Sequence, residues 1–117
     1  MTMTSSPVEM SERARGLLKA LASDTRQQIL MLFAGGIELT VNQVAERMSL
    51  AQSATSTHLA TLRDGGLLSS RREWKTVYYR ADPGRIGRAL TDLQLSLQAC
   101  CPPGDCRSDD RPVDGCG

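Results

Sequence analysis

Residues 51–64 of the chain read AQSATSTHLATLRD, and this stretch decides the fold. Its spacing predicts a helix with one apolar face, formed by Ala54, Thr55, Leu59 and Leu62. The opposite face carries only short polar side chains: Gln52, Ser53, Ser56, Thr57 and Thr61. Ser and Thr are poor helix formers, and a helix that needs only solubility uses Glu and Lys more often. Short hydrogen-bonding side chains let a helix lie deep in a groove, so this helix is typical of one that binds a partner.

The flanking segments extend this helix into a recognisable motif. A shorter amphipathic helix is predicted for residues 41–48, capped by Thr40 and followed by a tight break at residues 49–50. Two short helices joined in this way form a helix-turn-helix. Residues 67–72 and 76–81 follow as two predicted strands, joined by a turn with basic residues around it. A hairpin in this place is a wing.

Three further helices complete the predicted fold. They occupy residues 8–22, the segment from the Ser23 cap to Phe33, and the segment from Asp82-Pro83 to Ala99. The fold class is therefore mostly α with a β-hairpin wing, with four helices before the hairpin and one after it. We divide the chain into a disordered leader (1–7), a winged helix-turn-helix domain for DNA binding and dimerisation (8–99), a cysteine loop (100–106) and a disordered tail (107–117).

The distribution of charge points to a polyanionic partner. The net charge is only +1, but residues 63–88 carry seven bases against three acids, whereas residues 1–62 carry five of each. A basic block of this kind is the electrostatic footprint of a phosphate-binding surface. Charge alone leaves open a basic face that is merely solvated.

Composition limits the remaining possibilities. With 117 residues and 3% aromatic side chains, the chain is one small domain with an aliphatic core, and oligomerisation is a common way to stabilise such a domain. The leucine stripe Leu90, Leu93 and Leu97 exceeds what a small core needs, so we expect it to form a homodimer seam. No apolar run could span a membrane and no signal peptide is evident, so we expect a cytoplasmic protein. Apart from thiols there is no plausible catalytic group, which argues against an enzyme.

The cysteines are concentrated at one end of the chain. Cys100, Cys101 and Cys106 lie within one short segment, Cys116 follows alone, and no cysteine precedes them. Thiols of a cytosolic protein are kept reduced, which argues against a disulfide framework. Soft thiolates at close spacing select thiophilic metals and metalloids. Residues 102–104, Pro-Pro-Gly, can turn the chain so that Cys106 returns to the adjacent pair.

Taken together, these segments resemble the ArsR/SmtB family of winged-helix metal-sensing repressors over residues 8–106. The matching segments are 18–26 with Ile29-Leu30, 52–59 with Leu62, 66–68, and 77–80. The resemblance implies a homodimeric repressor that binds a palindromic double-stranded DNA operator. Base contacts are then expected from the exposed side of the 52–64 helix, and phosphate or minor-groove contacts from the wing. The expected DNA-binding residues are Gln52, Ser53, Ser56, Thr57, His58, Arg71, Arg72 and Lys75.

The family's inducer sites differ in position. The Cys-Val-Cys motif of its arsenic and cadmium site is absent from residues 39–44, and the last helix lacks the His ligands of its zinc and nickel site. Cys100, Cys101 and Cys106 instead resemble an arsenite site just past the last helix. Three thiolates suit pyramidal trivalent arsenic or antimony, so arsenite or antimonite is the expected inducer, in an arsenical-resistance role and without an organic cofactor. A zinc, cadmium or lead sensor, a thiol redox switch and an interaction module without an operator remain alternatives.

Overall fold

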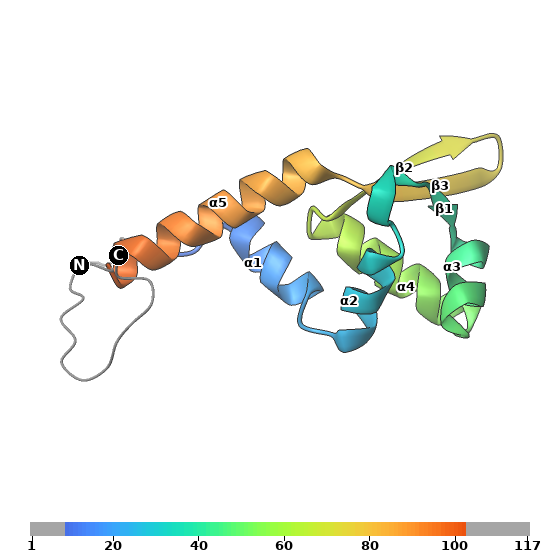
Figure 1. Ribbon diagram of the computed structural model, residues 1–117, viewed down its shortest axis with the longest axis horizontal. Coiled ribbons are helices and arrows are strands. Elements are labelled where there is room, and N and C mark those ends of the chain that lie inside the picture. The colour runs from blue at the N-terminus through green and yellow to red at the C-terminus, as the bar shows by residue number, and fades with distance from the viewer. Residues whose placement is uncertain (1–8, 103–117) are drawn as a thin grey trace, which may run out of the picture.

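The computed structural model describes residues 9–102 and has the mostly α, winged helix-turn-helix architecture that the sequence predicts (Figure 1). Four helices precede a β-hairpin and a fifth, long helix follows it. The elements are α1 (Glu12–Ala20), α2 (Asp24–Met31), the short 3-10 turn η1 (Ala34–Gly36), β1 (Leu39–Thr40), α3 (Val41–Met48), α4 (Gln52–Asp64), β2 (Leu68–Glu73), β3 (Thr76–Ala81) and α5 (Pro83–Cys100).

Side-chain caps set where most helices begin. The hydroxyls of Ser11, Ser23 and Thr40 each accept a hydrogen bond from a first-turn N–H of α1, α2 and α3. Because Ser11 caps α1, this helix begins at Glu12. The sequence predicted a helix from residue 8, and this prediction was wrong for Glu9 and Met10, whereas Val8 lies outside the described residues. Asp82 caps α5 in the same way, and the Ser69 hydroxyl together with the Arg85 N–H lowers the pKa of its carboxyl.

The sheet has one strand more than the sequence predicts. β1 pairs with β3 on the side opposite β2, which gives the antiparallel order β1-β3-β2. Leu39 lies opposite Tyr79 and Thr40 opposite Tyr78. A strand of two residues is too short to leave an alternating pattern in the sequence, and its partner is distant along the chain, so the prediction of only two strands was wrong. β1 joins the start of α3 to the base of the wing.

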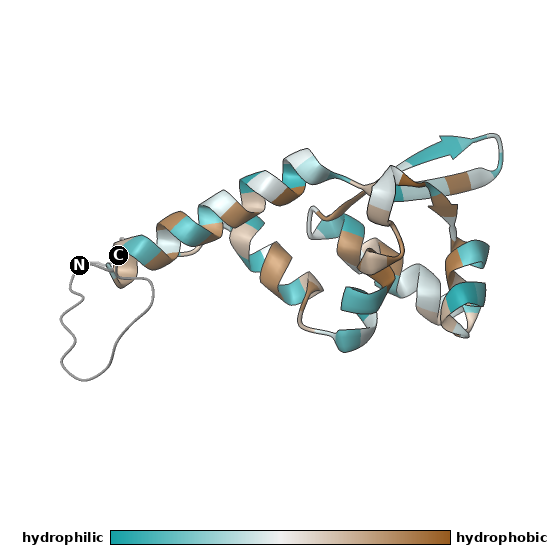
Figure 2. Cartoon of the chain, in the orientation of Figure 1, coloured by the Kyte–Doolittle hydropathy of each residue, from teal (hydrophilic) through white to brown (hydrophobic). Residues whose placement is uncertain are grey.

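The core lies between α2, α3, α4 and the sheet, and α5 extends beyond this head with α1 along its side (Figure 1). Its largest fully buried side chains include Phe33, Ile29, Leu59, Leu62 and Leu67. Thr55 is also fully buried, and its hydroxyl donates to the Ala51 carbonyl oxygen at 2.9 Å, which satisfies it inside the helix. Ala54, predicted for the apolar face, is exposed. Hydrophobic patches continue along the projecting part of α5 (Figure 2).

Glycines allow the end of α4 to approach α1 closely. A Cβ atom placed on Gly65 would lie 2.7 Å from the Gly16 carbonyl oxygen and 2.9 Å from the Ala20 Cβ. No larger residue fits at Gly65 unless α1 moves. At its other edge α1 is fixed to α5, since Asp92 accepts a hydrogen bond from Ser11 at 2.9 Å and pairs with Arg13 at 3.3 Å. Three helices are thereby held in one arrangement.

We predict that Gly65→Ala destabilises the fold, because the added methyl group would overlap backbone atoms of α1. The cost of such overpacking is about 1–3 kcal/mol in the free energy of unfolding, measured by urea denaturation. Gly87→Ala is the matched control, since nothing lies within 4 Å of a Cβ at that helical position. The control should be neutral or stabilising by roughly 0.5–1 kcal/mol. Equal stability of the Gly65 variant and wild type would contradict the close contact.

Candidate DNA-binding surface and cysteine site

The turn between α3 and α4 sets the direction of the candidate recognition helix. α3 ends at Met48, and the left-handed backbone of the next residue, Ser49 (φ 56°), reverses the chain before α4 begins. α4 then begins after Ala51, which has no side chain able to cap it. The first N–H groups of α4 therefore point outward without a side-chain partner from the cap position. Such a helix end suits a phosphate oxygen.

The structure brings four of the predicted base-contacting residues together. Gln52, Ser53, Ser56 and Thr57 are all exposed on the first two turns of α4. The Thr57 hydroxyl donates to the Ser53 carbonyl oxygen at 3.2 Å, which leaves its oxygen lone pairs as acceptors. The Gln52 amide offers both donors and an acceptor, the combination that reads an adenine edge in the major groove. This part of α4 has the chemistry of a base-reading surface.

His58 lies apart from that surface. It is half-buried, and its Nδ1 atom is 3.4 Å from the Arg26 Nη1 atom of α2. Arg26 is itself fixed, because its guanidinium donates to the carbonyl oxygens of Lys19 and Ala20. His58 thus joins α4 to α2, and a DNA contact by His58 stays a prediction. Nothing in the sequence pattern identified Arg26 as its neighbour.

Arg71 is engaged within the protein. Its guanidinium donates to both carboxylate oxygens of Glu38, at 2.9 and 2.8 Å, and to Glu73 at 3.0 Å. The guanidinium also lies 4.6 Å from the centre of the Tyr78 ring. The Arg71 hydrogen bond holds the pKa of Glu38 below its usual value, and the bonds to Glu38 and Glu73 raise the pKa of Arg71. Sequence reasoning missed Glu38, which lies before β1 and far from the wing along the chain.

Arg72 and Lys75 carry the charge that the wing presents to solvent. Arg72 follows Arg71 in β2, so the two side chains project from opposite faces of the hairpin. Within residues 9–102, Arg72 and Lys75 form no salt bridge. Lys75 Nζ lies 5.9 Å from the centre of the Trp74 ring, at the tip of the hairpin, where Trp74 is 83% exposed. The wing tip thus combines free cations with an aromatic ring.

The structure describes two of the three predicted metalloid ligands. Cys100 is the last residue of α5, so the helix ends one position later than the predicted boundary at Ala99, and Cys101 follows it directly. Both are exposed, and their sulfur atoms lie next to each other. Cys106 and Cys116 lie outside the described residues. Between residues 9 and 102 there is no cluster of three or more His, Cys, Asp or Glu side chains suited to a metal ion. Among the described residues, the predicted metalloid site therefore consists of the two adjacent sulfur atoms of Cys100 and Cys101.

The predicted dimer stripe divides between two roles. Leu90 and Leu97 are 51% and 48% exposed, whereas Leu93 is partly buried against the protomer's own core. Leu18 on α1 is exposed as well. Two exposed leucines on one side of a projecting helix are typical of a surface that a second copy covers.

Among the described helices, none is both long and apolar enough to cross a membrane.

Comparisons with known proteins bear directly on this arrangement. Residues 23–70, from the start of α2 into β2, match the family described as bacterial regulatory proteins of the arsR family. The transcriptional activator HlyU of Vibrio cholerae serotype O1 is 46% identical over 83 residues, which are 71% of this chain and 75% of HlyU. The arsenic resistance transcriptional regulator ArsR1 of Pseudomonas putida is 42% identical over 67 residues, which are 57% of this chain and 52% of ArsR1.

Solved structures agree with this relationship. HlyU from Vibrio cholerae superposes with a TM-score of 0.57 at 38% identity, over 75% of this chain and 92% of HlyU. A structure described as reduced HlyU superposes with a TM-score of 0.55 at 37% identity, over 76% of this chain and 90% of that chain. A third structure is a homodimeric winged helix-turn-helix DNA-binding domain from Mycobacterium bovis, described as a possible ArsR-family regulator. It superposes with a TM-score of 0.59 at 27% identity, over 82% of this chain and 89% of that chain.

The matched segment includes the complete helix-turn-helix, and the identity to HlyU extends over three quarters of that protein. The chain therefore belongs to the arsR family of bacterial regulatory proteins, which are DNA-binding transcriptional regulators and not enzymes.

Proposed function

We propose that this protein is a homodimeric repressor that leaves its operator when trivalent arsenic or antimony binds Cys100, Cys101 and Cys106. The observation that carries the proposal is the position of the cysteine pair. It lies at the end of α5, the same helix that presents Leu90 and Leu97 and packs against α1. A ligand held there acts directly on the helix that would join the two protomers.

The chemistry of the ligand follows from the residue type. When arsenite reacts with three thiols, three As–S bonds form, and each thiol proton leaves with one hydroxyl group as water. Adjacent residues bring two sulfurs within reach of one centre, and Cys106 supplies the third. The arsenic resistance regulator ArsR1 of Pseudomonas putida, a relative over 57% of this chain, makes an arsenical inducer a reasonable choice. A bound metalloid would hold the segment after α5 in one conformation.

The link to DNA is geometric. A dimer that binds a palindrome must hold its two recognition helices about one turn of DNA apart, roughly 34–36 Å. Any rotation of one protomer against the other at an α1–α5 seam changes that spacing. By linkage, a ligand that favours the rotated dimer weakens operator binding, and the operator weakens ligand binding by the same factor.

A thiol redox switch is a second candidate, because Cys100 and Cys101 place two sulfur atoms side by side. In this scheme two thiols lose two electrons and two protons to a peroxide or another oxidant as the S–S bond forms. One related structure is described as reduced HlyU. The two candidates share the same DNA-binding parts and differ only in the signal.

The first prediction concerns DNA recognition. Gln52→Ala should reduce the preference for the operator over random duplex by about 1–3 kcal/mol, because a side chain that reads a base edge is lost. Arg72→Ala should weaken both duplexes alike and lower the slope of log affinity against log salt by about 0.9, the value for one phosphate. Fluorescence anisotropy with labelled duplexes measures both. Gln28→Ala, an exposed glutamine on α2, is the matched control. Unchanged sequence preference in the Gln52 variant would show that α4 is not the reading helix.

The second prediction concerns assembly. Leu97→Asp should give monomers that bind the operator poorly, because a carboxylate would have to be buried without a partner in the seam. Leu95→Asp is the control: Leu95 is 59% exposed but lies on a different side of α5. Analytical ultracentrifugation at micromolar concentration measures the mass. A wild-type monomer, or equal effects of the two variants, would contradict this seam.

The third prediction concerns the signal. Cys100→Ser, Cys101→Ser and Cys106→Ser should each keep operator binding and lose most of the release by arsenite under reducing conditions, because a serine hydroxyl is a hard and poor ligand for a soft centre. Cys116→Ser is the control and should respond like wild type. If it loses release as fully as Cys106→Ser, a four-thiolate site for zinc, cadmium or lead is the better reading. If peroxide releases the operator and arsenite does not, the redox switch replaces the metalloid site.

A further inference from the structure

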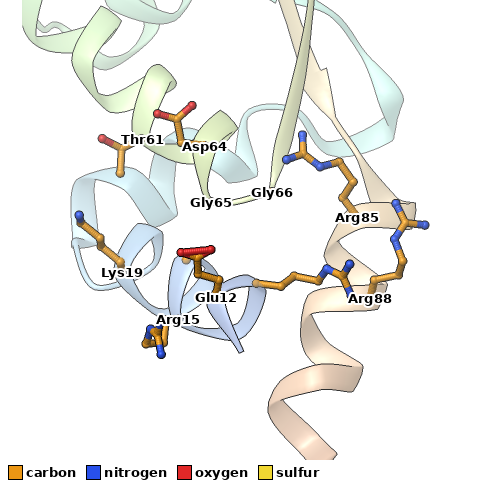
Figure 3. Close-up of a pocket in the computed structure, with 11 residues that line it drawn as sticks. Glu12, Arg15, Lys19, Thr61, Asp64, Gly65, Gly66, Arg85 and Arg88 are labelled. Carbon is orange, nitrogen blue, oxygen red and sulfur yellow. The ribbon is translucent and has the colours of Figure 1, made fainter. Parts of the chain in front are cut away.

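A basic cavity of about 760 Å³ lies between α1, the end of α4 and the start of α5 (Figure 3). Its basic lining residues are Arg13, Arg15, Lys19, Arg85 and Arg88. Among residues 9–102 its acidic lining residues are Glu12 and Asp64, so five bases less two acids leave these residues with a net charge of +3. None of the proposed roles of α4, the wing, the leucines or the cysteines uses this cavity.

The glycine turn after α4 keeps the cavity open. Gly65 and Gly66 form part of its wall, and Gly66 has a left-handed backbone (φ 86°) that few other residues adopt. A Cβ atom on Gly66 would lie 3.8 Å from the Arg85 guanidinium, so this turn and Arg85 face each other closely. Arg85 is also oriented by the carbonyl oxygens of Leu68 and Arg63, at 3.4 and 3.5 Å. One guanidinium is thus held in place before any ligand arrives.

Several of the cations lack an acidic partner. In the part of the chain from residue 9 to 102, Lys19, Arg85 and Arg88 form no salt bridge, whereas Arg13 pairs with Asp92. Asp64 is itself paired with Arg63, which reduces its effect on the cavity. Positive charges gathered from two helices without compensation raise the local concentration of anions. Arginine and lysine together suit phosphate and carboxylate groups, arginine through two parallel hydrogen bonds.

The cavity is separate from the other functional surfaces. It lies at the C-terminal end of α4, a helix of 13 residues and therefore roughly 20 Å long, whereas Gln52 and Ser53 lie at its N-terminal end. Arg88 and Leu97 are nine residues apart on α5, which is about two and a half turns, so they point to opposite sides. A ligand in the cavity would neither cover the base-reading residues nor block the leucine seam.

We propose that this cavity binds a small multivalent anion, one that carries at least two phosphate or carboxylate groups. Its volume is in the range of small-molecule sites, roughly 300–1,000 Å³, and larger than one phosphate needs. Arg85 and Arg88 line the cavity from α5 and Lys19 and Arg15 line it from α1, and the Arg85 guanidinium turns towards the glycine turn (Figure 3). Anion binding here would involve neither the cysteines nor a metalloid, so it can be tested independently of the inducer.

The test is a calorimetric titration of the full chain, without DNA and at constant ionic strength. Inorganic pyrophosphate and citrate are the two probes, and the tighter one identifies phosphate or carboxylate as the preferred group. Arg88→Gln and Lys19→Gln should each weaken binding about tenfold or more, the loss expected for a hydrogen bond to a charged group. Arg47→Gln, an exposed arginine on α3 outside the cavity, is the matched control and should leave binding unchanged.

Three results would overturn the proposal. The first is that neither probe binds the wild-type protein. The second is that Arg47→Gln weakens binding as much as Arg88→Gln does, since attraction to the net charge then explains it. The third is that Arg88→Gln leaves probe binding unchanged but lowers the salt slope of binding to random duplex, which would make the cavity wall a contact for the DNA backbone. Urea unfolding of each variant verifies that it is folded, and Lys19→Gln tests the site independently of α5.

Discussion

The close contact between the end of α4 and α1 is the constraint on which the rest of this structure depends. Because Gly65 leaves no room for a side chain against Gly16 and Ala20, the recognition helix ends directly on α1. Asp92 then fixes α1 to α5 through Ser11 and Arg13. Any displacement of the α1–α5 pair is therefore transmitted to α4 as a movement of a packed unit, since close-packed interiors do not absorb such shifts gradually. This is the mechanical condition that a regulated DNA-binding protein must meet.

A second set of contacts fixes the wing. Arg71 joins Glu38, Glu73 and Tyr78, so the segment before β1 is tied to the hairpin. The ion pair is exposed and contributes little to global stability. Its effect is on orientation: it uses the charge of Arg71 within the protein, whereas Arg72, on the other face of the strand, forms no salt bridge with any residue between 9 and 102. A basic segment in a sequence thus overstates the charge available to DNA, because some of its members have structural partners.

The sequence was most informative where one short segment carries the whole signal. The polar face of residues 52–57, the hairpin and the caps at Ser23 and Thr40 follow from local patterns, and the structure confirms these elements. Contacts between distant residues were not foreseeable. Examples are Glu38 with Arg71, Arg26 with His58, and the two-residue strand β1. The basic cavity is the clearest case, since its lining residues come from three helices and share no spacing in the sequence.

These features give α5 a particular role. The helix has 18 residues and is therefore roughly 27 Å long, with Arg85 and Arg88 near one end, Cys100 at the other and the exposed leucines between them. A ligand at either end would act on the same seam from opposite directions. A metalloid or disulfide at the cysteines would constrain the chain after α5, whereas an anion would draw the start of α5 towards α1. Because α1 contacts both α5 and the end of α4, the two signals would reach the recognition helix through one set of packed residues, and their effects on DNA affinity would be coupled without any contact between the ligands.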